Sequence, residues 1–527
     1  MYNVPFFVMQ KFTITPLRQR MQRNALLWQG VVKVNHGNVL NLLHGANLQQ
    51  GIVHLCHMKN TFLLFVLVMV QHCWNAQVYD GIWFGKIETP GMTIPIEMHW
   101  NVNNDGQYLM YSKEQTPKPL VMSVHEMKKG KIHWEIPRIK AQYDGNYDQA
   151  CDCFKGTYQQ SGYENELNWY RQAPSMENAV VPKDKPQTPH APYPYPTEVI
   201  DFLSFDQDGK SLSMQGTLSI PNGDGPFPCL VMITGSGPQD RDETLLGHKP
   251  FAVIAHELAQ KGWATFRYDE RGVGQSTGNY ELSTSADFAD DAYRALLTAR
   301  LHPKIDPNRV GLIGHSEGGM VAPMVAAAHP DEVYCIVSLA GTGVSGKDVL
   351  VKQSADISIA EGQKKEDAER DAAFVESLCD LMIQSKDSTE VANGIKNKVV
   401  MDSKDDHNDA TIEGQDLFDQ YNQQFNTAWM RFFITHNPQE NWQKVQCPTL
   451  ILSGDLDLQV NADVNTKAIS QALNARGVKN NVVILANHNH LFQYTETGRV
   501  SEYAKLDETI SPETLEEIVL WLKKLTP

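Results

Sequence analysis

One short turn constrains this chain more than any other feature of its sequence. The string Gly-His-Ser-Glu-Gly at positions 314–318 follows the apolar run 310–314 and precedes the apolar run 320–328. A strand that enters a helix through such a string makes a sharp turn, which projects the serine oxygen above the sheet. The pattern therefore predicts that Ser316 is a nucleophile at the carboxyl edge of a parallel sheet.

A second string of the same form, Gly-Gln-Ser-Thr-Gly, occupies positions 274–278. It follows a polar loop and precedes Asn-Tyr-Glu, so neither the strand nor the helix that the motif requires is present. We interpret Ser276 as an ordinary turn serine.

From Thr197 onward, short apolar runs alternate with segments of helical spacing. This alternation is typical of a largely parallel sheet covered by helices on both faces. The predicted strands are 199–205, 213–219, 229–234, 264–268, 310–314, 334–339, 449–453 and 482–485. Residues 346–444 are too many for a bare loop and have helical spacing, so we expect a helical cap over the carboxyl edge of an α/β sheet. The catalytic domain is expected to span 198–527.

Residues 78–171 have a different pattern, in which apolar and polar residues alternate in short runs separated by turn residues. Such runs predict antiparallel strands in a small barrel or sandwich, an accessory all-β domain. Four tryptophans lie in these runs, and their spacing fits either a packed core or a ligand-stacking surface: Trp83, Trp100, Trp134 and Trp169. The proline-rich segment 172–197 is expected to be a stiff linker between the domains.

The N-terminal 76 residues contain six basic residues and no Asp or Glu. Within them, Lys59 precedes the apolar run 61–70, and Ala76 provides a small residue at a cleavage site. This arrangement predicts a signal peptide at 58–76, beginning at Met58, and a periplasmic or secreted protein. The run is too short to span a bilayer. Residues 1–57 are expected to be a non-native or unstructured upstream segment.

The composition limits the partners that this chain can bind. Of its 527 residues, 46 are Lys or Arg and 62 are Asp or Glu, a net charge of −16 that disfavours nucleic acid. The cysteines are scattered, and Cys151 and Cys153 are expected to lie too close for an easy bridge. No motif for a metal or a cofactor stands out, so we expect neither.

Candidate partners for Ser316 follow the last two predicted strands. The seventh leads into Asp455 and Asp457, and the eighth into His488 and His490. A serine hydroxyl needs a base to take its proton, and that base needs a carboxylate to fix its tautomer. The chain order Ser, Asp, His is the order found in α/β-hydrolases.

Four strings carry a more specific resemblance. They are Gly-Ser-Gly-Pro-Gln-Asp-Arg-Asp-Glu at 235–243, Arg-Tyr-Asp-Glu-Arg-Gly-Val-Gly-Gln-Ser at 267–276, Gly-Leu-Ile-Gly-His-Ser-Glu-Gly-Gly at 311–319 and Asn-His-Leu-Phe-Gln at 489–493. With them, residues 215–345 and 446–493 resemble the alpha/beta-hydrolase superfamily. Within it they are similar to bacterial carboxylesterases related to serine aminopeptidase-like and dienelactone-hydrolase-like proteins.

The resemblance implies roles for individual residues. It selects Asp457 as the acid, with Asp455 as the rival, and His490 as the base, with His488 as the rival. An oxyanion hole is expected from the backbone N–H groups of Glu317 and of Ser236, with Gly237 as the alternative to Ser236. A structural charge cluster is expected from Asp240, Arg241 and Asp242, and another from Arg271 with Asp269.

The sequence therefore predicts a periplasmic serine hydrolase that cleaves carboxylic esters through an acyl-enzyme and needs no cofactor. Its partner would be a small-molecule ester, with a carbohydrate-linked ester as one option. A serine peptidase of the aminopeptidase-like type is the enzymatic alternative. A catalytically silent binding protein of the cell envelope is the alternative from another class.

Overall fold

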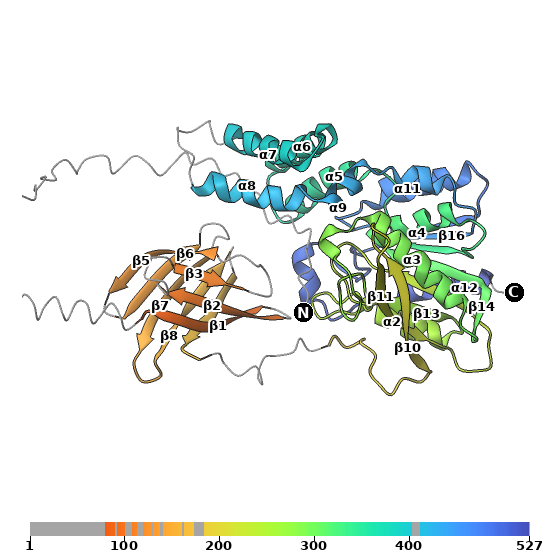
Figure 1. Ribbon diagram of the computed structural model, residues 1–527, viewed down its shortest axis with the longest axis horizontal. Coiled ribbons are helices and arrows are strands. Elements are labelled where there is room, and N and C mark those ends of the chain that lie inside the picture. Colours follow the sequence, from red (N-terminus) through yellow and green to blue (C-terminus); the bar gives the residue numbers. More distant parts are fainter. Residues whose placement is uncertain are drawn as a thin grey trace, which may run out of the picture.

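The computed structural model describes residues 79–89, 92–100, 108–112, 120–128, 130–136, 141–160, 163–172, 184–402 and 412–525. These residues form two separate sheets, one of nine strands and one of eight (Figure 1). The predicted signal peptide at 58–76 and the upstream segment 1–57 lie outside the described residues. No helix in the described part is long and apolar enough to cross a membrane.

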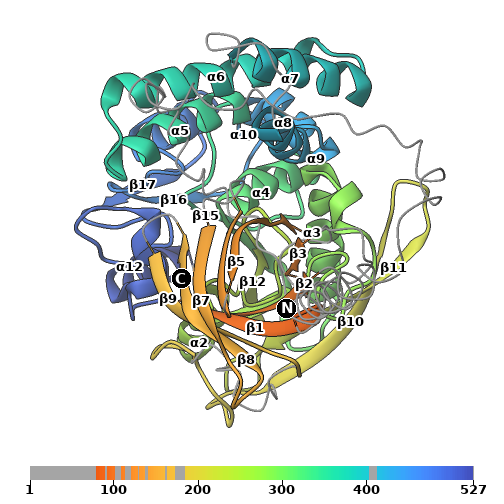
Figure 2. The same cartoon turned by 90° about the vertical axis from the view of Figure 1, so that its left-hand side faces the viewer.

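The nine-stranded sheet is antiparallel and nearly closed, with the order β4-β3-β2-β1-β9-β8-β7-β6-β5. Its strands are β1 (Gly81–Thr89), β2 (Met92–Trp100), β3 (Tyr108–Tyr111), β4 (Leu120–Val121), β5 (Ser123–Lys128), β6 (Lys131–Ile136), β7 (Ala141–Asp148), β8 (Cys153–Gln160) and β9 (Tyr163–Tyr170). β4 and β5, at opposite ends of this order, are separated in sequence by Met122 alone. One continuous segment thus bends from β3 to β6, and Figure 2 shows the strands curling round as a barrel.

The interior of this barrel is packed with aromatic side chains. Trp83, Trp134 and Trp169 are completely buried and Trp100 is nearly so. The rings of Trp134 and Tyr143 stack with their centroids 5.4 Å apart. Of the two interpretations of the tryptophans, the structure shows the packed core, because inward-facing aromatic residues fill a small barrel.

The expectation for Cys151 and Cys153 was wrong, since the structure joins them in a disulfide. They lie where the chain turns from β7 into β8. The intervening Asp152 adopts φ 46°. This left-handed turn brings the two Cα atoms to 5.2 Å, within the range that a disulfide spans.

The second half of the proline-rich segment is bound to the catalytic domain. The Lys185 ammonium donates to the carbonyl oxygens of Ala504 at 2.9 Å and Leu506 at 2.7 Å. The Gln187 side-chain amide donates to the Ile510 carbonyl at 2.7 Å and accepts the Ile510 N–H at 3.1 Å. Residues 184–196 are therefore a packed strap on the catalytic domain and not a free spacer.

The eight-stranded sheet has the order β10-β11-β13-β12-β14-β15-β16-β17. Its strands are β10 (Thr197–Phe205), β11 (Ser211–Ser219), β12 (Phe227–Ile233), β13 (Ala264–Tyr268), β14 (Ile305–His315), β15 (Ile336–Leu339), β16 (Thr449–Gly454) and β17 (Asn480–Leu485). β11 is antiparallel to both of its neighbours, and all later pairs are parallel. Every strand predicted for this domain is present.

Helices cover both faces of this sheet and enclose two apolar cores. One core lies under α3 (Ser285–Arg300), α4 (Glu317–Ala328) and α11 (Ala462–Asn474). The other lies under α2 (Pro250–Gln260) and α12 (Pro512–Leu525). Because the central strands are buried on both faces, they are largely apolar, as in parallel sheets generally.

The segment between β15 and β16 is helical, as predicted. It contains α5 (Gly346–Ala360), α6 (Lys365–Gln384), α7 (Ser388–Asp402), α8 (Ile412–Phe425), α9 (Ala428–Thr435) and α10 (Pro438–Trp442). α5 packs on α6 and α9, and these helices share a core with Met320 of α4. Figures 1 and 2 both show α5–α8 stacked beyond one side of the sheet.

Candidate active site

Ser316 occupies the turn between β14 and α4, as the Gly-His-Ser-Glu-Gly string predicted. Its backbone has φ 53° and ψ −113°, and its N–H donates to the Leu339 carbonyl at 2.8 Å. A side chain on Gly314 would place its Cβ 2.1 Å from the Gly318 oxygen, and one on Gly318 would lie 2.1 Å from the Ile233 oxygen. Only glycine fits at these two positions, so the sequence forces the strained turn that presents Ser316.

Ser276 is held by backbone groups, in agreement with its interpretation as a turn serine. Its hydroxyl donates to the Asp269 carbonyl at 2.7 Å and accepts the Gln215 N–H at 3.1 Å. The side chain is buried, and it bridges the loop after β13 to β11. Its hydroxyl is thus a structural bridge.

His490 and Asp457 meet at the carboxyl edge of the sheet. Asp457 Oδ2 lies 2.8 Å from His490 Nδ1, and both residues are buried. Asp457 follows β16 and His490 follows β17, and these neighbouring parallel strands end at the same edge. The carboxylate therefore fixes the Nδ1–H tautomer of His490 and leaves Nε2 as the basic nitrogen.

The two rival residues are engaged elsewhere. Asp455 Oδ1 accepts the N–H of Asn487 at 2.6 Å and caps the turn that leads to the histidines. The His488 ring lies 2.8 Å from the Ala486 carbonyl and 2.7 Å from Ser511 Oγ. The structure thus brings Asp457 and His490 together and gives Asp455 and His488 other partners.

The loop after β12 offers a backbone donor beside Ser316. The N–H of Gly235 is taken by Glu243 Oε1 at 2.6 Å, and that of Gly237 by the Tyr280 hydroxyl at 2.9 Å. The Ser236 N–H, by contrast, makes no hydrogen bond to the described residues. The N–H of Glu317 lies in the first turn of α4, where helix amides have no intrahelical acceptor. The amides of Ser236 and Glu317 are thus both available to a bound oxygen.

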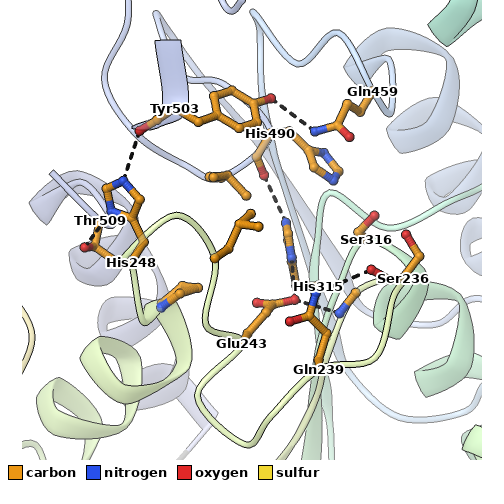
Figure 3. A pocket seen from close by; sticks show the side chains of 14 residues that line it. Ser236, Gln239, Glu243, His248, His315, Ser316, Gln459, His490, Tyr503 and Thr509 are labelled. Atoms are coloured by element: carbon orange, nitrogen blue, oxygen red, sulfur yellow. Dashed lines mark hydrogen bonds and ion pairs between the residues drawn. The ribbon is translucent and has the colours of Figure 1, made fainter. Parts of the chain in front are cut away.

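Ser316, Ser236 and His490 line one pocket (Figure 3). Part of its wall is apolar, formed by Leu245, Pro250, Leu491 and the ring of Tyr503. The rest is polar and includes the amide of Gln459, which donates to the Tyr503 hydroxyl at 3.1 Å. The pocket therefore combines a candidate nucleophile and base with a mixed surface for a small organic substrate.

The Glu317 side chain is a buried carboxyl directly after the serine. Its Oε1 accepts the hydroxyl of Ser285 at 2.6 Å and the indole N–H of Trp429 at 2.7 Å. Burial raises the pKa of Glu317 to about 7, although the two hydrogen bonds act in the opposite direction. Through Trp429, this carboxyl ties helix α9 of the insertion to the serine turn.

The expected pairing of Arg271 with Asp269 was wrong. Asp269 binds Arg241, whose Nη2 lies 2.7 Å from Asp269 Oδ2. Arg271 instead binds Asp291 at 2.7 Å and Asp287 at 3.1 Å, both on α3. The two partners come from a helix that follows the string, so spacing along the string could not indicate them.

Sequence reasoning also missed Glu243 and His315 as a pair. His315 Nδ1 lies 2.9 Å from Glu243 Oε1, and both residues are buried and line the pocket. Both residues lie within the strings that carry the family resemblance. Their meeting depends on the packing of two loops 72 residues apart, which no local pattern reveals.

The sheet order, the antiparallel second strand and the serine turn define an α/β-hydrolase, a class of hydrolytic enzymes. The family model described as X-Pro dipeptidyl-peptidase (S15 family) matches residues 208–491, slightly more than half of the chain. The chain therefore belongs to that family, and its predicted membership of the alpha/beta-hydrolase superfamily is confirmed.

The curated proteins that are similar in sequence include an esterase and an uncharacterized protein. Esterase EstD of Thermotoga maritima is 35% identical over 130 residues, which cover 24% of this chain and 31% of that esterase. An uncharacterized 31.7 kDa protein of Escherichia coli is 30% identical over 265 residues, covering 50% of this chain and 83% of that protein. The chain thus matches less than a third of the length of EstD.

Among solved structures, Est1E from Butyrivibrio proteoclasticus, with ferulic acid bound, matches with a TM-score of 0.36 and 16% identity. That match covers 62% of this chain and 98% of Est1E. Dienelactone hydrolase from Anabaena variabilis matches with a TM-score of 0.33 and 16% identity, covering 63% of this chain and 96% of that enzyme.

Proposed function

We propose that this protein is a serine hydrolase that cleaves carboxylic esters through an acyl-enzyme, with Ser316, His490 and Asp457 as its triad. The observation that carries the proposal is the bond between Asp457 and His490 in the pocket that Ser316 enters from its strained turn. A serine, a base with a fixed tautomer and free backbone donors are the parts that acyl transfer needs.

The chemistry follows from these positions. His490 Nε2 takes the proton of Ser316 as the hydroxyl oxygen attacks the ester carbonyl, and Asp457 stabilises the imidazolium that forms. The N–H groups of Ser236 and Glu317 bind the negative oxygen of the tetrahedral intermediate. His490 then gives its proton to the leaving alcohol. Water, activated by the same histidine, releases the carboxylic acid and regenerates Ser316.

The choice of an ester over a peptide rests on similarity and on chemistry. EstD is named an esterase, whereas the family description names a dipeptidyl-peptidase. An ester has the better leaving group, so the same triad cleaves it more readily than an amide. A serine peptidase remains the alternative, and the family description is the observation that favours it. The intact pairing of Asp457 and His490 argues against a silent binding protein.

Three further assignments belong to the same proposal. We propose that helices α5–α9 act as the cap of the pocket, because Trp429 of α9 binds Glu317 beside the nucleophile. The all-β domain at 78–171 would be accessory, because the triad and both oxyanion donors belong to residues 198–527. Export to the periplasm or outside the cell rests on the predicted signal at 58–76 alone.

The test is a substrate screen with the full chain. It compares p-nitrophenyl esters of graded acyl length with aminoacyl and X-Pro anilides, using wild type and Ser316→Ala side by side. We expect turnover of short esters that exceeds turnover of every anilide and that Ser316→Ala abolishes. Preference for an X-Pro anilide would replace the ester assignment with the peptidase, and ester turnover that survives in Ser316→Ala would overturn the proposed nucleophile.

A further inference from the structure

His315 bridges two loops that the proposed reaction uses. Its Nε2 lies 3.0 Å from the carbonyl oxygen of His490, and its Nδ1 lies 2.9 Å from Glu243 Oε1. His315 directly precedes Ser316, so the ring is anchored at the serine turn itself. The ring therefore ties the backbone that carries His490 to the backbone that carries the nucleophile.

Glu243 extends this bridge to a third loop. The same oxygen that faces His315 accepts the N–H of Gly235 at 2.6 Å, next to the proposed oxyanion donor Ser236. A Cβ on Gly235 would lie 3.1 Å from Glu243 Oε1, 3.3 Å from Ser316 Cβ and 3.4 Å from His315 Nδ1. The oxyanion loop is thus in close contact with both members of the pair.

The partners determine where the protons lie. A carbonyl oxygen can only accept, so Nε2 of His315 carries a proton that it donates to His490. Nδ1 faces a carboxylate that already accepts an amide N–H, so a proton is held between Nδ1 and Glu243 as well. Burial lowers the pKa of His315, but the charge and hydrogen bond of Glu243, together with the His490 carbonyl and the charge of Asp457, outweigh it and the net pKa is raised. An imidazolium that donates from both nitrogens fits these contacts (Figure 3).

We propose that Glu243 and His315 are positioning residues that hold the serine turn, the histidine loop and the oxyanion loop in the geometry for acyl transfer. The inference rests on the proposed function and adds two residues to it. Neither side chain needs to touch the reacting atoms. The pair acts by fixing the backbone of His490 and the N–H of Gly235, since small displacements of reacting groups slow a reaction strongly.

Two substitutions of His315 separate its two bonds. His315→Gln places an amide nitrogen near the position of Nε2 and can still donate to the His490 carbonyl. His315→Asn places its amide near Nδ1, so it can still reach Glu243 but loses the bond to His490. Glu243→Gln keeps an acceptor for Gly235 but removes the charge. Trp442→Phe is the control for stability, because it removes one buried bond, from Nε1 to the Thr342 carbonyl at 3.1 Å, outside the pocket.

The experiment measures kcat and KM of the full chain on the best ester of the screen, with the melting temperature of each variant from circular dichroism. We expect His315→Asn and Glu243→Gln to lower kcat by about 10- to 100-fold with KM within about threefold, because they displace the reacting groups and leave the apolar part of the pocket wall unchanged. His315→Gln loses the bond to Glu243 and keeps the bond to His490, so its kcat should fall as in Glu243→Gln. The double variant Glu243→Gln/His315→Asn should be little worse than the poorer single variant, since the pair acts as one unit.

The proposal is overturned if the folded variants retain kcat within twofold of wild type, or if kcat falls no further than in a Trp442→Phe protein of equal melting temperature. It is also overturned if the double variant loses kcat by the product of the two single losses, because the two residues would then act independently. If one of the three single variants fails to fold, the other two single variants test the proposal. Ser316→Ala tests the proposed function separately from the positioning role. If Ser316→Ala is inactive while the variants of Glu243 and His315 behave as wild type, only the positioning role is wrong.

Discussion

Asp457 Oδ2 lies 2.8 Å from His490 Nδ1, and the other oxygen of the same carboxylate accepts the N–H groups of Gln459 and Val460 at 2.8 Å each. Both oxygens are thus held, one by the backbone that follows β16 and one by the imidazole. A carboxyl group whose two oxygens are both hydrogen-bonded cannot rotate without losing a bond. The orientation of the His490 ring is therefore set by the turn after β16.

Replacing Asp457 by Asn is expected to lower kcat by about 10⁴-fold, because the amide favours the wrong tautomer of His490. Asp455→Asn is the matched control, since Asp455 accepts one backbone N–H in the same turn and does not contact His490. Ester hydrolysis at saturating substrate measures both. A loss in Asp455→Asn that equals the loss in Asp457→Asn would contradict the assignment.

A serine-directed phosphonate should label wild type and Ser276→Ala but not Ser316→Ala. Ser276 makes two hydrogen bonds to the backbone. Its removal should therefore cost about 1–3 kcal/mol in the free energy of unfolding and leave the labelling intact. Mass spectrometry of the labelled peptide and urea denaturation measure the two effects. The prediction would be contradicted by phosphonate bound to Ser276, or by equal labelling of Ser316→Ala and wild type.

The buried Glu317 carboxyl should make stability depend on pH. Burial raises its pKa from 4.5 to about 7 in the native state, so the native protein keeps a proton that the unfolded chain releases between these values. The contribution of Glu317 to stability is therefore fully present below pH 4.5, declines as the pH rises to 7 and is constant above. The decline amounts to about 3 kcal/mol.

Glu317→Gln removes this titration but keeps an oxygen that can accept from Ser285 and Trp429. The variant should gain stability relative to wild type as the pH rises from 4.5 to 8, with a difference in the free energy of unfolding that grows by about 3 kcal/mol. Urea denaturation at both pH values measures it. A difference that does not change with pH would show that the native carboxyl is already ionised at pH 4.5. The backbone N–H is unchanged, so the variant should still hydrolyse esters.

The strap at 184–196 predicts where the catalytic domain can be cut. A fragment 184–527 should fold and hydrolyse a small activated ester, since the proposed triad lies within it. A fragment 197–527 lacks the bonds of Lys185 and Gln187 to the segment 504–510 and should be less stable by about 2–5 kcal/mol. Circular dichroism and ester turnover of both fragments measure this. A folded but inactive 184–527 would instead show that the barrel completes the active site.

The sequence predicted those features of the fold and of the site that depend on residues close together along the chain. The eight strands of the catalytic sheet follow from apolar runs, and Ser316 follows from glycines that a tight turn requires. The choice of Asp457 over Asp455 came from the family pattern, and the structure gives each a different partner. Contacts between segments that are distant in sequence could not be predicted. The bonds of Arg271 to α3, of Gln187 to Ile510 and of Glu243 to His315 arise only once the sheet is assembled.

The segment formed by β4 and β5 affects how the barrel can associate with another chain. A sheet ends in rows of unpaired N–H and C=O groups, which another chain can extend by adding a strand. In the described part of the barrel, β4 and β5 are the two ends of the sheet, and they are joined at Met122. β4 pairs with β3 and β5 pairs with β6, so this one segment covers the edges of both β3 and β6. The catalytic sheet, by contrast, has two outer strands: β10 exposes Val199, Leu203 and Phe205, and β17 exposes Val482 and Ile484. If two copies of this chain join by strand pairing, the outer strands of the catalytic sheet and not the barrel offer the template.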